Sequence, residues 1–247
     1  MPASLSVNLN KVALLRNSRG RDVPRLIDAV DLALASGAHG ITLHPRLDQR
    51  HVRLTDLPIV TDHLRQHHRG VELNLECEDD PELIDRVVAL RPDQCTLVPV
   101  EPGEITSDHG WRLPEQADRL RPVLERLRAE GIRTSCFADC EPTAVARFAE
   151  LGVDRVELYT GPYAWAWGTP RQEHELQRVI ATARAATAAG LGLNAGHDLD
   201  RHNLEGLRPL EALAEVSIGH ALISRALEIG LPAGVRELLD ALGWPRP

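Results

Sequence analysis

Short apolar runs alternate with segments of helical periodicity along the whole chain. The apolar runs predict eight strands, over residues 5–10, 40–44, 71–76, 94–99, 133–139, 155–160, 192–195 and 215–219. Between them lie segments such as 24–38 and 114–131, in which apolar residues recur at helical spacing. Alternating strands and helices imply a parallel sheet, and eight such units close into a barrel. We therefore predict an α/β fold of one domain over residues 1–247, a single (β/α)₈ TIM barrel with extra helices.

Proline and glycine mark the boundaries of several predicted helices. Asp80-Pro81 and Glu141-Pro142 suit a first helical turn. Glycines that suit helix carboxyl termini precede the next strands, at Gly37, Gly131, Gly152 and Gly190. Residues 161–170, rich in Gly, Pro and Trp, follow the sixth strand and are predicted to form a loop.

The predicted strands carry polar side chains on one face. Successive side chains of a strand point to opposite faces, so Asn8 and Asn10 share one face and Val7 shares the other with Leu9. The second, third and sixth strands have similar polar sets: Thr42, His44 and Arg46; Glu72, Asn74 and Glu76; Glu157 and Tyr159. The outer face of a barrel packs against helices, so these polar sets are expected to face the interior. Because buried charge without partners is costly, we interpret the polar interior as a functional site rather than only a structural network.

Titratable side chains gather at the predicted carboxyl ends of the strands, where barrel enzymes place their active sites. His44, Glu76, Glu157, His197 and His220 are expected to converge there. Histidine titrates near neutrality and a dry site raises the pKa of a carboxyl group, so the set can transfer protons. One such histidine alone favours a hydrogen-bonded core residue. Three, at the ends of strands two, seven and eight, favour a catalytic site.

Two glycine–histidine segments follow the seventh and eighth strands, at 194–197 (NAGH) and 217–220 (SIGH). Glycine lets a ligand approach the backbone, and the helix predicted after His220 offers free N–H groups to an anion. Cationic side chains follow the first two strands: Arg19, Arg46, Arg50 and His51. We therefore predict one phosphate site beside strands seven and eight and another near strand two.

No metal site is predicted. A metal-dependent barrel hydrolase would carry clustered ligands such as His-x-His on its first strand. This chain has Asn8 and Asn10 there instead. His67 and His68 lie in a polar helical stretch and are expected to be solvated.

The composition argues against several kinds of partner. A formal net charge of −8 disfavours nucleic acid and anionic membrane surfaces. The sequence has no run of about 18 apolar residues and no apolar signal-peptide core near its start. Four cysteines without a Cys-x-x-Cys pair fit a reduced protein. We expect a cytoplasmic protein that binds neither nucleic acid nor membrane.

A collinear series of motifs resembles the pyridoxine 5′-phosphate synthase family. The series runs from the first strand to the eighth: SVNLNKVALLRNSRG at 6–20, GITLHPR at 40–46 with Arg50 and His51, NLE at 74–76, LVP at 97–99, ELYTG at 157–161, NAGH at 194–197 and IGH at 218–220. So many motifs in order are highly specific for the fold and quite specific for the activity. The resemblance implies a cytoplasmic homo-octamer of vitamin B6 synthesis that needs no metal or organic cofactor. It also implies condensation of 3-amino-2-oxopropyl phosphate with 1-deoxy-D-xylulose 5-phosphate to give pyridoxine 5′-phosphate, inorganic phosphate and water.

The resemblance also implies roles for individual residues. His44 and Glu76 match the family's proton acceptors, His197 its proton donor and Glu157 its transition-state stabiliser. The positions that match the aminoketone phosphate site are Asn8, Arg19, Gly219 and His220. Those that match the deoxyxylulose phosphate site are Arg46, His51 and Thr106. Thr106 lies in a long segment, 100–113, that resembles a lid over the barrel mouth.

This chain departs from the most common family pattern at two places. It has Asn10-Lys11 where many members have Asp-His, and it resembles an Asn-Lys branch of the family. Lys11 is the one lysine among 28 lysine and arginine residues, so we hypothesise that it supplies a cation to the substrate that arginine cannot replace. The simpler interpretation is a solvent-facing lysine. Asp198 stands where a glycine is common, and its charge is expected to raise the pKa of His197.

Two other functions fit the same residues. The first is another phosphosugar aldolase or isomerase, with Lys11 forming a Schiff base. The second is a barrel that binds a phosphorylated metabolite without catalysis. The presence of His44, Glu76 and His197 together argues against the second, because a binding protein needs no matched acid and base.

Overall fold

Eight parallel strands form a closed barrel in the order of the chain, with β8 paired to β1. The computed structural model describes residues 1–101 and 107–245. The strands are β1 (Ser4–Asn8), β2 (Gly40–Leu43), β3 (Glu72–Cys77), β4 (Gln94–Leu97), β5 (Arg133–Ala138), β6 (Arg155–Tyr159), β7 (Gly192–Gly196) and β8 (Leu213–Ile218). This confirms the predicted TIM barrel, and each strand begins and ends within two residues of its predicted bounds.

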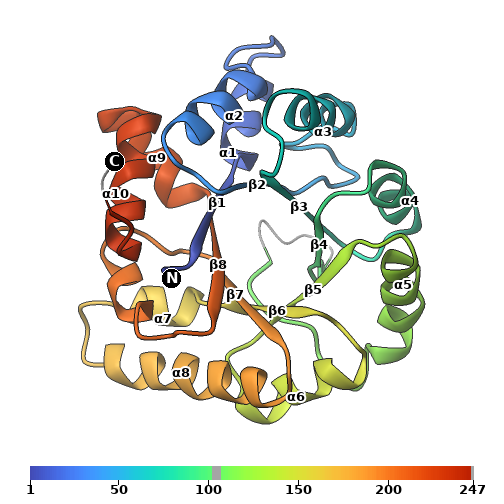
Figure 1. Ribbon diagram of the computed structural model, residues 1–247, viewed down its shortest axis with the longest axis vertical. Helices are drawn as coiled ribbons and strands as arrows, with labels where there is room; N and C mark the ends of the chain where they lie inside the picture. Colours follow the sequence, from blue (N-terminus) through green and yellow to red (C-terminus); the bar gives the residue numbers. More distant parts are fainter. Residues whose placement is uncertain (102–106, 246–247) are drawn as a thin grey trace.

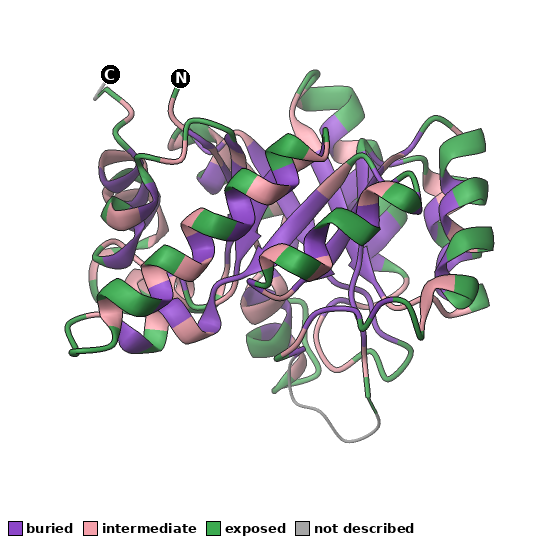
Figure 2. Ribbon diagram, turned by 90° about the horizontal axis from the view of Figure 1, so that it is seen from below, coloured by how far each residue is buried: buried purple, intermediate pink, exposed green. Residues whose placement is uncertain are grey.

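Helices surround the barrel as an outer ring (Figure 1). They are α1 (Asn10–Asn17), α2 (Leu26–Ala35), α3 (Asp56–His67), α4 (Pro81–Leu90), α5 (Ala117–Ala129), α6 (Pro142–Glu150), α7 (Gly161–Ala166), α8 (Gln172–Ala188), α9 (His220–Ile229) and α10 (Leu231–Leu242), with a 3₁₀ turn η1 (Asn203–Leu207). Their inner faces are buried and their outer faces exposed (Figure 2). The sequence explains why α4 begins at Pro81. The Asp80 carboxylate accepts the backbone N–H groups of Glu82 and Leu83, and Pro81 has no N–H group that would need a partner. None of the helices in these described residues is long and apolar enough to cross a membrane.

The apolar core lies between the strands and the helices. Alternate strand residues such as Leu73 and Leu75 join helix residues such as Val87 in one continuous buried cluster. The side chains on the other strand face are polar, and they point into the barrel interior, where some of them meet across it. Asn194 Nδ2 of β7 lies 3.5 Å from Gln94 Oε1 of β4, and these two strands are not neighbours in the sheet. The predicted inward orientation of the polar face is therefore confirmed.

Three local predictions were wrong. The first strand ends at Asn8, and Asn10 begins α1, because the Asn8 side chain accepts the Asn10 N–H at 3.0 Å and turns the chain. Residues 161–170 were predicted to be a loop but contain α7, with Pro162 in its first turn. His67 is exposed as expected, but His68 is only partly exposed because its ring bonds to Asp31 of α2.

Candidate active site

A cavity of about 420 Å³ opens at the carboxyl ends of the strands. Its lining draws on residues at the ends of β1, β2, β3, β6, β7 and β8. Twelve of the fourteen predicted site residues line it: Asn8, Asn10, Lys11, His44, Arg46, His51, Glu76, Glu157, His197, Asp198, Gly219 and His220. The topology therefore gathers side chains that lie up to 212 residues apart in the chain, from Asn8 to His220.

The other two predicted site residues are not placed in this lining. Arg19 is exposed just beyond the end of α1 and is not among the residues that line the cavity. Thr106 lies outside the described residues, with part of the segment expected to act as a lid. The described part of that segment is anchored by Trp111, whose buried indole N–H donates to the Leu97 carbonyl at 2.8 Å.

His44 and Glu76 form a buried pair on neighbouring strands. His44 Nδ1 lies 3.5 Å from Glu76 Oε2, which also accepts the Asn8 amide at 3.3 Å. The Asn10 side chain accepts the His44 backbone N–H at 2.8 Å and fixes the turn that carries the ring. His44 Nε2 has no hydrogen-bond partner among the described residues. One ring nitrogen thus faces a carboxylate while the other is left to react, the arrangement of an oriented general base.

Glu157 is a carboxyl group held deep in the barrel. Burial, and then the nearby Glu76 and Glu215, raise its pKa well above the usual range. This shift favours the protonated form, and a neutral carboxyl group can donate a hydrogen bond to developing negative charge. Gly196 of β7 makes room for it, because a Cβ there would lie 2.1 Å from Glu157 Oε1.

His197 sits across the cavity mouth on a left-handed backbone, with φ of 78°. Its ring packs against Phe137 and Tyr159, with centroids 5.1 and 5.4 Å away. Burial lowers its pKa below the usual histidine value, while Glu76 and Asp198 act in the opposite direction. The expected effect of Asp198 is present, but desolvation outweighs it. His197 is therefore neutral at pH 7.

Asp198 also has a left-handed backbone, with φ of 56°. This conformation favours glycine, so a side chain at this position is strained. The Asp198 carboxylate accepts the Trp165 indole N–H of α7 at 2.8 Å. That bond ties the turn carrying His197 to a neighbouring helix.

Basic side chains gather on the wall of the cavity formed by α1 and the segment after β2. Lys11, Arg46, Arg50 and His51 all line it. Burial, followed by the nearby His44, Arg46, Lys11 and Arg50, lowers the pKa of His51 to about 3. His51 is therefore neutral. Since its Nδ1 accepts the Val52 N–H at 2.9 Å, its proton is on Nε2.

The amino terminus of α9 forms the part of the wall that follows β8, beside α1. Gly219 precedes the helix and His220 begins it. A Cβ at Gly219 would come within 3.1 Å of three Asn8 atoms, so the glycine permits β1 and β8 to end side by side. The unpaired N–H groups and positive end of the helix dipole suit an anion.

Several lining residues were not predicted. Ser217 faces the cavity and lies 3.5 Å from Glu76 Oε1. Ser217 could have been predicted from the sequence, because it lies on the polar face of β8 between two apolar neighbours, Val216 and Ile218. Leu14, Val98, Ser107 and Phe137 also line the cavity, and no periodicity distinguished them from core or loop residues.

Comparisons with known proteins agree with this geometry. The family model for the pyridoxal phosphate biosynthesis protein PdxJ matches residues 5–243. A protein of Albidiferax ferrireducens named pyridoxine 5′-phosphate synthase is 47% identical over 252 residues, covering 100% of both chains. A protein of the same name from Mesorhizobium japonicum is 45% identical and covers 99% of this chain and 100% of its own.

Solved structures show the same fold at low sequence identity. The tryptophan synthase complex of Pyrococcus furiosus contains a chain that superposes with a TM-score of 0.64 at 15% identity, covering 96% of this chain and 98% of that one. Phosphoribosyl anthranilate isomerase from Thermus thermophilus gives 0.59 at 14% identity, covering 97% and 98%. These likenesses concern the barrel alone. The full-length sequence matches go further: the chain belongs to the family of the pyridoxal phosphate biosynthesis protein PdxJ, and it is an enzyme.

Proposed function

We propose that this enzyme is a pyridoxine 5′-phosphate synthase. It condenses 3-amino-2-oxopropyl phosphate with 1-deoxy-D-xylulose 5-phosphate and releases inorganic phosphate and water. The observation that carries the proposal is the convergence of His44, Glu76, Glu157 and His197 in one cavity that cationic side chains and a helix amino terminus also line. The names of the full-length relatives support the same reaction.

Proton transfer is the chemistry that the cavity has to supply. Joining an amine to a ketone, losing water and closing a ring each move protons. We assign His44 and Glu76 as proton acceptors, because the carboxylate lies 3.5 Å from one ring nitrogen and stabilises the charge that the ring acquires. We assign Glu157, whose pKa is raised by burial, as the group that stabilises oxyanions formed during the condensation.

His197 is assigned as the proton donor. It is neutral because burial lowers its pKa. Two bound phosphate groups bring negative charge into the cavity and favour the protonated ring. In this proposal, substrate binding itself charges the acid, and Asp198 contributes in the same direction.

Two phosphate sites hold the substrates in register. We assign the aminoketone phosphate to Asn8, Gly219 and His220 at the start of α9, and the deoxyxylulose phosphate to Arg46 and His51. Arg19 and Thr106 are further candidates for these two sites, one each. The role of Arg19 requires its exposed side chain to turn toward the cavity from the end of α1. No metal or organic cofactor is required by this scheme.

The direct test is to incubate the purified protein with both substrates and to follow pyridoxine 5′-phosphate and released phosphate. We expect both products in equal amounts. His44→Gln and His197→Gln should each lower kcat by about 10²–10⁴-fold, the usual contribution of a general acid or base. His174→Gln, an exposed histidine of α8, is the control and should leave kcat unchanged. Absence of product with a correctly folded protein would refute the proposal.

The position of Lys11 keeps a Schiff-base aldolase or isomerase as the second candidate. Its amine lines the cavity and is the one lysine amine of the chain. Borohydride reduction in the presence of each substrate separates the two functions. A stable adduct on Lys11 would favour the second candidate, and its absence together with product formation favours the first.

We also propose that the enzyme acts in the cytoplasm as a homo-octamer. Both statements rest on the family to which the chain belongs. Exposed apolar side chains on the helices, such as Leu15 of α1 and Leu227 of α9, are consistent with surfaces that become covered on assembly.

A further inference from the structure

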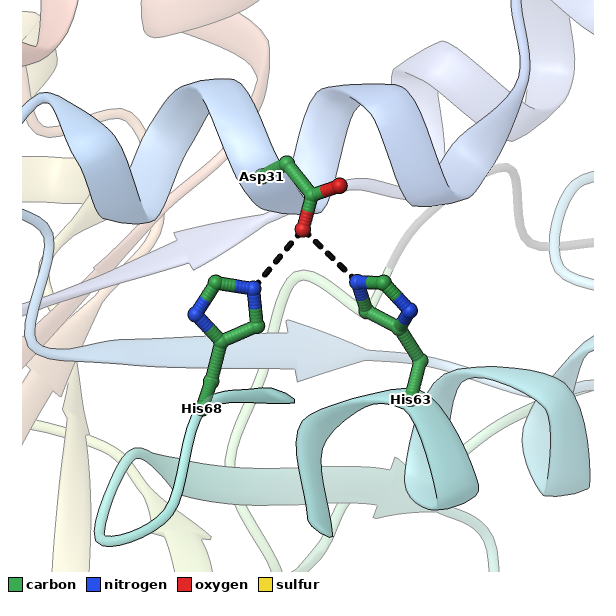
Figure 3. A group of neighbouring side chains, drawn as sticks. All are labelled: Asp31, His63 and His68. Carbon is green, nitrogen blue, oxygen red and sulfur yellow. Dashed lines mark hydrogen bonds and ion pairs between the residues drawn. The ribbon is translucent and has the colours of Figure 1, made fainter. Parts of the chain in front are cut away.

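Three side chains outside the barrel mouth point toward a single position. Asp31 projects from α2, His63 from α3, and His68 from the residue that follows α3 (Figure 3). Asp31 Oδ1 lies 2.7 Å from His63 Nε2 and 2.7 Å from His68 Nε2. These three atoms, one from each side chain, lie within 4.8 Å of one another.

The three side chains are held in place by the fold but remain accessible to solvent. The side chains of His63 and His68 are 19% and 25% exposed, and that of Asp31 is 48% exposed. The rings are thus held by packing while the carboxylate faces solvent. None of the three residues lines the active-site cavity, so this cluster is separate from the catalytic groups.

The ligand chemistry selects a class of cation. Two imidazole nitrogens and one carboxylate oxygen suit borderline divalent metals such as Zn²⁺, whereas Ca²⁺ and Mg²⁺ prefer oxygen ligands alone. Zinc bonds to imidazole nitrogen and carboxylate oxygen are about 2.0–2.2 Å long, and neighbouring ligands of a tetrahedral ion lie on the order of 3–3.5 Å apart. The two separations of 2.7 Å between Asp31 and the histidines therefore widen slightly when an ion enters.

The protons also balance. In the metal-free cluster each ring donates its Nε2 proton to the carboxylate, so Nε2 has no free electron pair. Metal binding requires that pair, and each ring provides it by moving its proton to Nδ1 or releasing it to solvent.

We propose that Asp31, His63 and His68 form a surface site for a divalent transition-metal ion such as Zn²⁺. Three protein ligands leave a fourth position for water. The ion bridges α2 to the end of α3 and stabilises the outer helical layer without taking part in the reaction.

The test is direct binding of Zn²⁺ to the chelator-treated protein, with crystals soaked in Zn²⁺ and measured at the zinc absorption edge. We expect anomalous density between the three side chains. Asp31→Asn and His63→Gln should each weaken Zn²⁺ binding at least about tenfold, since even outer-shell changes cost 10–100-fold. Zn²⁺ should raise the Tm of the wild-type protein more than that of either variant.

Controls separate this site from the histidines of the active-site cavity. His174→Gln, on exposed α8, should bind Zn²⁺ like the wild type. Circular dichroism and the condensation assay show that each variant is folded, and His63→Gln should keep full activity in the absence of metal. The proposal is overturned if the protein does not bind Zn²⁺, if both variants bind it as tightly as the wild type, or if the density lies at His44 and His197 alone.

Discussion

His51 is an imidazole held neutral beside three cationic side chains at the barrel mouth. Its pKa in the folded protein is about 3, below the ordinary value of 6.5. Between about pH 3 and pH 6.5, His51 therefore binds a proton in the unfolded chain but not in the folded protein. The stability that this group contributes is complete above about pH 6.5 and is lost as the pH falls toward about 3.

The first prediction concerns this proton. Between pH 7 and pH 5 the wild-type protein should lose up to about 2 kcal/mol of unfolding free energy through His51, at about 1.4 kcal/mol per pH unit below 6.5. His51→Gln should lose correspondingly less over the same interval. Urea unfolding at the two pH values measures both. Equal losses would mean that His51 is protonated in the folded protein.

The second prediction tests whether Lys11 has a function specific to lysine. Lys11→Arg keeps the charge but replaces a compact ammonium group with a larger planar one. In the cavity this should raise the KM for 1-deoxy-D-xylulose 5-phosphate by roughly tenfold, equivalent to about 1.4 kcal/mol. Arg25→Lys, at an exposed position before α2, is the control. Unchanged KM and kcat in Lys11→Arg would show that any cation suffices.

The third prediction concerns Gly196. The added methyl group of Gly196→Ala would lie 2.1 Å from Glu157 Oε1 and displace the carboxyl group, which can turn at modest cost in stability. Displacement by about an ångström should lower kcat by about 100-fold. In a Glu157→Ala background the same change should have little further effect. Equal effects in both backgrounds would locate the damage elsewhere.

At the scale of elements, a buried ion pair joins the first and third helices. The Arg16 guanidinium of α1 contacts both carboxylate oxygens of Asp56, the first residue of α3, at 2.7 and 2.8 Å. Their side chains are 2% and 10% exposed. This pair holds α1, which begins with Asn10 and Lys11, against the segment that carries His51.

The fourth prediction follows from this burial. Asp56→Ala leaves the Arg16 charge buried without its partner, so the unfolding free energy should fall by about 3–5 kcal/mol. Asp28→Ala breaks an exposed pair with Arg25, in which both side chains are more than half exposed, and should cost under about 1 kcal/mol. Denaturant titration of both variants provides the comparison. A similar small loss in both would mean that water replaces the carboxylate beside Arg16.

The barrel and most of its mouth were predictable because both follow from periodicity. Alternation in the strands placed Glu76 and Glu157 in the interior, and position at strand ends placed His44, His197 and His220. Tertiary contacts without periodicity were not predictable. The Arg16–Asp56 pair spans 40 residues and leaves no pattern in either helix.

The same limit explains why His68 was expected to be solvated. Its partner Asp31 lies on another helix, and only the docking of α2 against α3 brings them together. Asn10 illustrates a related limit. The Asn8 side chain accepts the Asn10 N–H, and this one hydrogen bond ends β1 two residues earlier than the alternation of polar and apolar residues indicated.

At the scale of the whole molecule, the fifth prediction concerns assembly. One chain has a mass of 27.2 kDa, so an octamer should have a mass of about 218 kDa, eight times that value. Light scattering coupled to size-exclusion chromatography measures this without a shape assumption. Exposed apolar side chains such as Leu15, Ile59 and Leu227 are surfaces that subunit contacts in an octamer would bury. A mass near 27 kDa at micromolar concentration would contradict the expected octamer.

The solitary lysine at the cavity wall has a practical consequence. The chain has two primary amines, its amino terminus and Lys11. Acylating reagents therefore have two amine targets, the exposed amino terminus and Lys11 at the barrel mouth, and a bound substrate should shield Lys11 alone. Bifunctional amine cross-linkers, by contrast, find few amines to join between subunits. Acylation at Lys11, measured against that at the amino terminus, becomes a gauge of how much of the protein has substrate bound.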